Sequence, residues 1–273
     1  MTAQALSDPI LHITGLTKAF GGLKAVDDVH LDVAACSITS LIGPNGAGKT
    51  TVFNLITGLL QPTSGEVLYR GRKITGLPPT RVARAGIGRT FQEPRAFGRL
   101  SVLDNVLLGF QNQKGERVYH ALLRTRGSLK QEKENLEKAM QTLQFVGLAE
   151  RSTDLAQNLS HGQQRFLSIG RVLASDPDLL LLDEPTVGLH REEVNRLIDL
   201  LADLVHTQKR TVLLIEHNMD VVMTISQEIH VLVEGKRFVH GRPDEIKENP
   251  RIIEAFLGTT VSRDVQTGGA PCN

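Results

Sequence analysis

One glycine-rich segment has the residue types and the spacing that bind nucleotide phosphates: Gly43-Pro44-Asn45-Gly46-Ala47-Gly48-Lys49-Thr50. Its glycines let the backbone wrap closely around phosphate groups, and N–H groups at a helix N-terminus attract their negative charge. Lys49 is placed to neutralise the β- and γ-phosphates, and the Thr50 hydroxyl to coordinate Mg²⁺. Thr51 is interpreted either as a core residue or as a contact to the α-phosphate. The segment therefore predicts a site for ATP or a related nucleotide with Mg²⁺.

Two adjacent carboxylates, Asp183 and Glu184, follow the apolar run from Leu179 to Leu182. A phosphoryl-transfer site needs an acid at the end of a buried strand to hold the metal, and a group that activates the attacking water. We therefore expect Asp183 to hold Mg²⁺ in its second coordination shell and Glu184 to polarise water as the general base. The alternative for Glu184 is a purely structural role, as a cap on the next turn.

The elements that must position these residues alternate between strand and helix. The phosphate segment lies between a strand expected from Ser37 to Ile42 and a helix whose apolar residues recur at helical spacing from Val52 to Leu59. Further along, the pattern predicts buried strands at 179–182, 211–215 and 229–233, with helices at 194–205 and 219–225. Strands that alternate with helices imply a parallel sheet covered on both faces.

Other segments show different patterns. Val29, Leu31 and Val33 alternate with polar residues, which predicts a half-buried antiparallel strand. The stretch from Ser101 towards Val146 is predicted to be largely helical, with Ser101 and Asp104 spaced as a capping box. The remaining expected elements are a turn at 62–65, strands at 66–70 and 87–91, and helices at 159–174 and 250–258.

Composition and charge exclude several classes of protein. The chain has 273 residues, a formal net charge of +1 and 22% charged residues, which argues against a protein that coats nucleic acid. No apolar stretch approaches the length of a membrane-spanning helix, and Met1 to Asp8 lacks the basic and apolar regions of an export signal. Cys36 and Cys272 indicate neither a disulfide framework nor a metal site. These features predict a cytoplasmic protein that has no nucleic acid as a partner.

The segment Leu159-Ser160-His161-Gly162-Gln163-Gln164-Arg165 resembles the LSGGQ signature of ABC-type ATPases. Gln92, in Arg89-Thr90-Phe91-Gln92, is similar to the Q-loop glutamine of that family, and His217 is similar to its switch histidine. The resemblance implies an α/β P-loop NTPase, with a RecA-like parallel-sheet core, an N-terminal antiparallel β subdomain and an inserted α-helical subdomain. It implies one ABC ATPase domain at 9–258, in which the core is at 9–90 and 174–242, the helical subdomain at 91–173 and a C-terminal helix at 243–258. The segment 259–273 has little apolar content, which predicts a mobile tail.

The resemblance also implies how two such subunits would act. Two chains would close head-to-tail around two ATP molecules, so that Ser160, Gly162 and Gln163 of one chain meet the ATP bound by the other. Gln92 would contact Mg²⁺ or water and relay closure to the membrane partner. His217 would contact the γ-phosphate and help to fix the attacking water.

Three positions differ from the usual pattern of the family. Phe20 stands where the family has an aromatic residue, commonly Tyr, that stacks on adenine; the alternative is that Phe20 is a core residue. His161 replaces the first glycine of the LSGGQ signature, a change that we expect to be tolerated. His190 falls where many members carry the D-loop aspartate. We hypothesise that His190 makes a different hydrogen bond across the dimer and that its protonation tunes turnover.

Within the family, the closest resemblance is to the ATP-binding subunits of branched-chain amino-acid importers and of related amide or urea importers. It is carried by Arg89 to Gln92, by Glu216 to Met223 and by Asn249 to Gly258. It implies an ATP-hydrolysing subunit at the cytoplasmic, inner face of the cell membrane that powers uptake through transmembrane permeases. Its partners would be a second ABC ATPase subunit, identical or paralogous, and indirectly a solute-binding protein.

Two alternatives belong to the same family: an ATPase of lipid or lipopolysaccharide export, and a soluble non-transport ABC ATPase. The soluble DNA-repair members insert a long coiled coil between the phosphate loop and the signature. The interval from Lys49 to Ser160 is far too short for such an insertion and shows no sustained heptads. Transport therefore remains the leading expectation.

Overall fold

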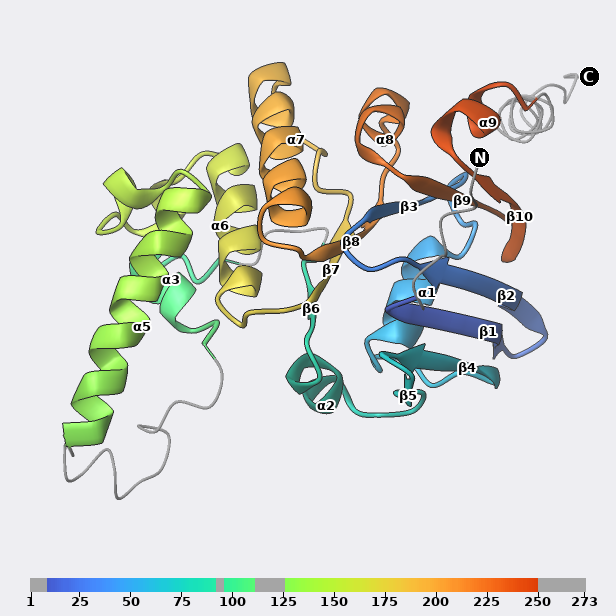
Figure 1. Cartoon of the computed structure of the whole chain (residues 1–273), viewed down its shortest axis with the longest axis horizontal. Coiled ribbons are helices and arrows are strands. Elements are labelled where there is room, and N and C mark those ends of the chain that lie inside the picture. Colours follow the sequence, from blue (N-terminus) through green and yellow to red (C-terminus); the bar gives the residue numbers. More distant parts are fainter. Residues whose placement is uncertain (1–8, 92–95, 111–125, 250–273) are drawn as a thin grey trace, which may run out of the picture. The chain divides into compact units, whose positions relative to one another are not determined.

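The computed structural model describes residues 9–91, 96–110 and 126–249 (Figure 1). The described residues form two compact units. One contains the residues up to Leu77 and from Leu213 onward, and the other contains Pro78–Val212. The division falls within strand β8 (Thr211–Ile215), whose first residues belong to the second unit and whose last residues belong to the first.

The first unit contains a four-stranded antiparallel sheet in the order β2-β1-β4-β5. Its strands are β1 (Leu11–Phe20), β2 (Leu23–Val33), β4 (Ser64–Tyr69) and β5 (Arg72–Lys73). Val29 and Val33 are fully buried and alternate with less buried residues, which confirms the half-buried strand predicted there. The sequence pattern does not predict β1. Register shifts beyond Ile13 break its apolar alternation, and the next fully buried residue is Leu16.

The first unit also contains the elements that flank the phosphate segment. β3 (Ile38–Ile42) is buried throughout and pairs in parallel with β9 (Glu228–Val233), which pairs with β10 (Lys236–Gly241) in the antiparallel sense. The helices of this unit are α1 (Lys49–Ile56), α8 (Met219–Ile225) and α9 (Pro243–Lys247). Ile42, Ile229 and Val231 of the strands form one core cluster with Val222 of α8 and Ile246 of α9.

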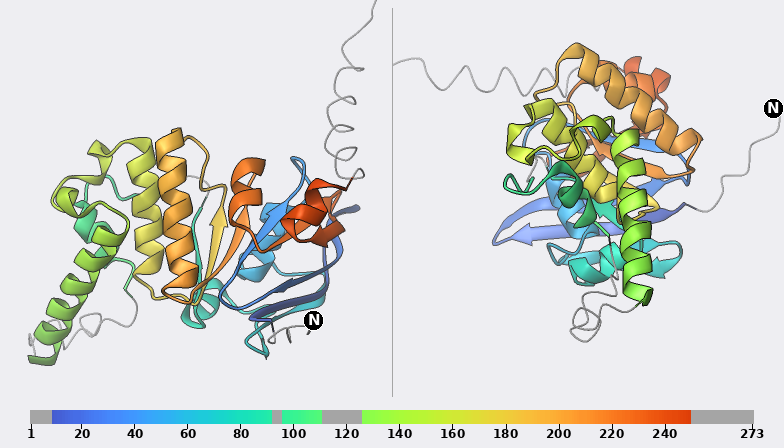
Figure 2. Two further views of the ribbon diagram at one scale, coloured as in Figure 1. Left: turned by 45° about the horizontal axis from the view of Figure 1, so that its top comes forward. Right: turned by 90° about the vertical axis from the view of Figure 1, so that its left-hand side faces the viewer.

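The second unit combines a parallel strand pair with helices. β6 (Ile87–Arg89) pairs in parallel with β7 (Leu179–Asp183), and every residue of β7 is buried. The helices are α2 (Pro79–Arg84), α3 (Val102–Leu107), α5 (Arg126–Phe145), α6 (His161–Leu173) and α7 (Arg191–His206). Two 3₁₀ turns, Ala149–Arg151 and Ala156–Asn158, precede α6. Figure 2 shows α6 and α7 side by side.

The strand order of the second sheet is β10-β9-β3-β8-β7-β6. With its parallel pairs, this sheet confirms the predicted α/β class, and the separate antiparallel sheet confirms the predicted N-terminal β part. Predicted elements agree best with the structure where apolar runs are continuous, as at β3, β7 and β8. The largely exposed strand β10 was beyond prediction, since it lacks a buried apolar pattern.

The cap of α3 and the start of the C-terminal helix agree with the prediction. Ser101 caps α3, and its Oγ accepts a hydrogen bond from Asp104 N at 3.0 Å, which confirms the predicted cap. α9 occupies the start of the C-terminal helix predicted at 243–258. The expected helix at 250–258 and the tail at 259–273 lie outside the described residues. The domain limits given above stay a prediction.

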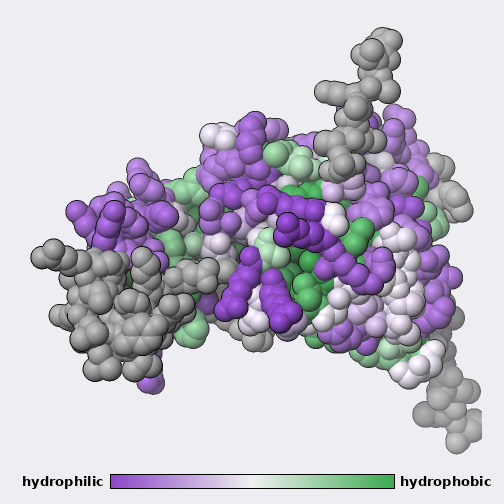
Figure 3. Space-filling model, turned by 60° about the horizontal axis from the view of Figure 1, so that its bottom comes forward, coloured by the Kyte–Doolittle hydropathy of each residue, from purple (hydrophilic) through white to green (hydrophobic). Residues whose placement is uncertain are grey.

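Among the described residues, no helix has both the length and the apolar character needed to cross a membrane. The face shown in Figure 3 carries hydrophilic and hydrophobic residues interspersed with one another. Large apolar side chains are exposed in the second unit, where Phe91 is 47%, Phe97 51% and Leu108 55% exposed. Exposed apolar groups that lie together mark candidate interaction surfaces.

Candidate functional site

The phosphate loop connects the end of β3 to the start of α1. Its backbone can follow this path only with glycine at key positions: Gly43 has φ 150° and Gly48 has φ 96°. A Cβ atom at Gly43 would lie 2.1 Å from Leu232 O, and one at Gly48 would lie 2.4 Å from Ala25 O. The glycines are therefore required first by contacts within the chain, in addition to any contact with phosphate.

Neighbouring strands hold the loop in place. Gly235 N, in the turn between β9 and β10, donates to Ala47 O at 3.2 Å, and Asp27 N of β2 donates to Gly235 O at 2.8 Å. Lys49 is 6% exposed, and its Nζ donates to Gly43 O at 2.8 Å and to Pro44 O at 2.9 Å. The ammonium group is thus fixed inside the curve of the loop, which is where the phosphate charge is expected.

The other predicted loop residues differ in exposure. Ala47 is buried and contributes its carbonyl to the support just described, whereas Thr51 is half-buried on α1. Asn45, Gly46 and Thr50 are exposed, so that a ligand can reach them. The loop therefore presents Thr50 at the first turn of α1 while keeping its supporting residues inside.

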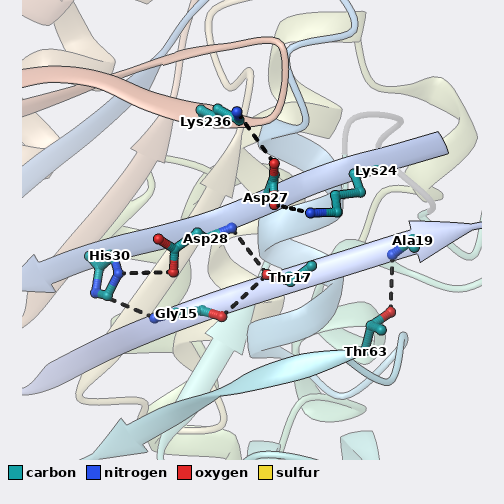
Figure 4. A network of polar contacts seen from close by, with 9 residues as sticks. All are labelled: Gly15, Thr17, Ala19, Lys24, Asp27, Asp28, His30, Thr63 and Lys236. Carbon is teal, nitrogen blue, oxygen red and sulfur yellow. Dashed lines mark hydrogen bonds and ion pairs between the residues drawn. The ribbon is translucent and has the colours of Figure 1, made fainter.

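A polar network anchors β1, which ends at Phe20, and the neighbouring strand β2 (Figure 4). Thr17 Oγ1 accepts from Asp28 N at 3.0 Å and donates to Gly15 O at 3.3 Å, and Thr63 Oγ1 accepts from Ala19 N at 3.0 Å. Asp27 forms ion pairs with Lys24 at 2.8 Å and with Lys236 at 3.4 Å. The hydrogen bond from Lys24 is the main cause that lowers the pKa of Asp27. These contacts fasten β1 and β2 beside the phosphate loop that β2 supports.

Phe20 is 48% exposed at the end of β1, so the alternative of a core residue does not hold. Lys18 Nζ lies 5.1 Å from the centre of its ring and also donates to Gln61 O at 2.7 Å. The cation over the ring adds a favourable contact that restricts where the ring can move. Stacking of Phe20 on adenine stays a prediction.

His217 follows the end of β8 in the same unit as the phosphate loop. The preceding residue, Glu216, is 1% exposed, and its Oε2 accepts from His217 N at 3.0 Å and from Asn218 N at 3.2 Å. Asn218 in turn caps α8. A buried carboxylate therefore fixes the turn that presents His217 to solvent, and sequence reasoning had assigned no role to Glu216.

Asp183 ends β7 and is 2% exposed. Its Oδ2 accepts from Arg89 Nη2 at 3.1 Å, and its N donates to Thr90 Oγ1 at 3.4 Å. Burial lowers the pKa of Arg89, and the neighbouring Asp183 opposes that change. The sequence shows Arg89 only as part of a motif. Its pairing with Asp183 follows from the parallel register in which Arg89 lies opposite Leu181.

Glu184, the predicted general base, has φ 48°, in the left-handed region that residues with side chains rarely adopt. Such conformations cost about 1–3 kcal/mol and persist only where the surroundings impose them, often at functional sites. The strained turn directly follows the fully buried strand β7. The choice between an active and a purely structural role for Glu184 stays a prediction.

The signature segment begins α6. Ser160 is the N-cap, and its Oγ accepts from Gln163 N at 3.2 Å, while Gln163 Oε1 accepts from Ser160 N at 3.0 Å and from Arg151 Nη1 at 2.9 Å. Gln163 thus holds the helix start with its side chain, and its contact with a nucleotide stays a prediction. Ser160 and His161 are exposed, whereas Gly162 is buried. His190, which is also exposed, is the N-cap of α7.

The predicted residues therefore fall into two groups. The first unit contains the phosphate loop, Phe20 and His217. The second contains Asp183, Glu184 and the signature residues Ser160, Gly162 and Gln163. Gln92 lies outside the described residues. The individual roles of these residues stay predictions.

A parallel-sheet core with a glycine-rich loop between β3 and α1 defines a P-loop nucleotide-binding domain. The pattern of the ABC transporter family matches residues 26–187, more than half of the chain. The high-affinity branched-chain amino acid transport ATP-binding protein LivG of Escherichia coli K12 is 42% identical over 253 residues, covering 93% of this chain and 99% of LivG.

Solved structures give the same result. An ATP-binding cassette of an ABC transporter in its ADP conformation has a TM-score of 0.81 and 32% identity, covering 92% of this chain and 100% of that one. The dimeric structure of a bacterial ABC transporter cassette has a TM-score of 0.72 and 26% identity, covering 85% and 98%. The chain belongs to the ABC transporter family, as an ATP-hydrolysing subunit.

Proposed function

We propose that this chain hydrolyses ATP to power the uptake of branched-chain amino acids through partner permeases. The observation that supports the substrate class most strongly is the likeness to LivG, which extends over almost the full length of both proteins. The chain would then act at the cytoplasmic, inner face of the cell membrane. Lipid or lipopolysaccharide export and a soluble non-transport role remain the alternatives that the experiment below separates.

Mg²⁺ fits the oxygen donors that the sequence provides. Thr50, Asp183 and Gln92 offer a hydroxyl, a carboxylate and an amide oxygen, which Mg²⁺ prefers. The Asp183 carboxylate is buried and already faces one cation, the Arg89 guanidinium. Over the described ranges, no group of three or more His, Cys, Asp or Glu could hold a metal ion, so phosphates and water would complete the coordination. The ion would neutralise phosphate charge.

The remaining chemistry belongs to the side chains. The loop N–H groups and Lys49 would bind the phosphates, and Phe20 would stack on the adenine. Glu184 would take a proton from the attacking water, and His217 would orient that water from the γ-phosphate side. The turn that carries His217 is fixed by Glu216, which limits the motion that would otherwise misplace the water.

A second ATPase subunit, identical or paralogous, would complete each site with its signature segment. Ser160 Oγ accepts from Gln163 N, so its own proton can be donated to a γ-phosphate bound by the other chain. The α6 N-terminus adds N–H groups and the positive end of the helix dipole. Gln163 would act in this contact through the capped helix start.

A permease would dock on the second unit. A pocket of about 430 Å³ has Phe97 and Leu108 among its lining residues, together with Arg171. The Arg171 guanidinium lies 4.9 Å from the centre of the Phe97 ring. An apolar pocket with a cation at its wall suits a short amphipathic helix of a membrane partner. Phe91, which also lines this pocket, precedes Gln92 in the chain, and this adjacency supports a relay from ATP to the permease. A solute-binding protein would act on the outer side of that permease.

The test is uptake by cells of the source organism in which the gene is deleted and restored. We expect deletion to abolish high-affinity uptake of labelled leucine, isoleucine and valine while leaving proline uptake unchanged. The parent chain should restore uptake, and Glu184→Gln should not. Unchanged branched-chain amino-acid uptake, or a defect confined to export of lipid or lipopolysaccharide, would contradict the proposed substrate class.

A further inference from the structure

The carboxylate of Glu193 touches two segments of the second unit that are distant in sequence. Glu193 lies in the first turn of α7, and its Oε2 accepts from His190 N, the N-cap position, at 3.0 Å. A Cβ atom placed on Gly162 would lie 2.0 Å from Glu193 Oε1 and 2.5 Å from Oε2. The carboxylate therefore lies directly on the backbone of Gly162 in the signature segment.

Two further contacts join the same segments. His161 lies against Gly188, where an added Cβ would be 2.8 Å from His161 Cε1. Arg165 of α6, which is 3% exposed, donates from Nη2 to Val187 O at 3.2 Å. The first five residues of α6 thus contact residues 187–193 at three places, consistent with the side-by-side helices of Figure 2.

We propose that Glu193 is a positioning residue that holds the signature segment, residues 160–163, in register with the loop from Gly188 to His190. This inference rests on the proposed function, in which the signature segment meets the ATP of the other subunit. The N–H groups at the start of α6 stabilise phosphate only when they point at it, so a fixed orientation contributes directly to the rate. The Glu193 carboxylate holds this orientation through its contacts with Gly162 and with His190 N.

The geometry changes the interpretation of Gly162. From the sequence, Gly162 is expected only to meet the ATP bound by the other chain. In the structure Gly162 is buried, and a side chain there would displace Glu193. Gly162 therefore leaves room for the carboxylate of Glu193 within its own chain, and the ring of His161 lies against Gly188.

The test compares Glu193→Ala, Glu193→Asp and Glu193→Gln with Glu192→Ala. Glu192 is an exposed glutamate in the same first turn of α7 and is the matched control. We expect Glu193→Ala to lower kcat about tenfold or more, a change of the size expected for lost positioning. The affinity of the isolated subunit for a fluorescent ATP analogue should stay within about twofold, because the phosphate loop belongs to the other unit.

The conservative variants separate geometry from charge. Glu193→Gln keeps an oxygen that can accept from His190 N and should retain most of the activity. Glu193→Asp keeps the charge but draws it back from Gly162, so kcat should fall, even in a chain that folds normally. Glu192→Ala should behave as the parent. A purely structural role for Glu193 would lower the melting temperature without this pattern in kcat.

A double variant gives a second readout. If Gly162→Ala acts by displacing Glu193, the variant with both Gly162→Ala and Glu193→Ala should be no slower than the slower single variant. Losses that multiply, or Glu193→Ala with the parent's kcat, would overturn the proposal. A parent chain that hydrolyses no ATP would instead contradict the proposed function, so the two failures are distinguishable.

Discussion

At the scale of the residue, buried titratable groups lie outside the predicted site as well as in it. His230 on β9 is 1% exposed, and its ring stacks on that of His240 with 5.5 Å between the centres. Burial, then the positive charges of His240 and Arg237, lower the pKa of His230 to about 4, against an opposing effect of Asp32. Glu228 Oε1 lies 3.4 Å from His230 Nε2, and burial raises the pKa of Glu228.

This pKa predicts that stability falls in mild acid. The folded chain binds a proton at His230 less readily than the unfolded chain, in which the pKa is near its ordinary value of 6.5. The contribution is therefore full above pH 6.5 and is lost as pH falls towards 4. We expect a loss of about 2 kcal/mol in the free energy of unfolding at pH 5 relative to pH 7.5.

Urea unfolding at pH 5 and pH 7.5 measures this effect. His230→Gln should remove about 2 kcal/mol of the pH dependence, whereas His206→Gln, at an exposed position on α7, should leave it unchanged. An equal pH dependence in the parent and in His230→Gln would show that His230 is not its source.

At the scale of the element, the junction of β3, the phosphate loop and α1 depends on close backbone contacts. Gly48→Ala would put a methyl group 2.4 Å from Ala25 O in a residue with φ 96°. The loop must shift to relieve that contact, which would move the N–H groups that bind phosphate. We expect ATP affinity to fall at least about tenfold, since such contacts depend on sub-ångström placement.

Gly71→Ala is the matched control for this change. Gly71 has φ 69°, but nothing lies within 4 Å of an added Cβ. It should lose about 1–2 kcal/mol of stability from its backbone conformation alone and bind ATP as the parent does. Isothermal titration with ATP and Mg²⁺ checks both variants, and equal affinities for them would refute the role given to the Ala25 contact.

Contiguity along the chain decides how much of the fold and of the site could be predicted from the sequence. The phosphate loop and the pair Asp183–Glu184 are contiguous in sequence, so their spacing alone reveals them. Contacts between residues that are far apart in the sequence cannot be read from such spacing. Arg89 reaches Asp183 through the register of two strands, and Glu193 reaches Gly162 through the packing of two helices. β1 was missed because its bulges disrupt the alternation that identifies a strand.

At the scale of the whole molecule, the chain carries the parts of two half-sites. The phosphate loop and His217 belong to one compact unit, and the signature segment belongs to the other. The signature segment is exposed at Ser160 and His161, where another subunit could reach it. The central claim is therefore that an active site forms from the phosphate loop of one chain and the signature segment of a second.

Mixing two inactive variants tests that claim most directly. Lys49→Ala damages the phosphate loop, and Ser160→Arg blocks the signature segment, so each variant alone should hydrolyse almost no ATP. In a dimer of one chain of each kind, one site has both an intact loop and an intact signature segment. An equal mixture should recover roughly a quarter of the parent rate, because half of the dimers are mixed and each has one intact site. A mixture no more active than the separate variants would contradict a site shared between two copies of this chain.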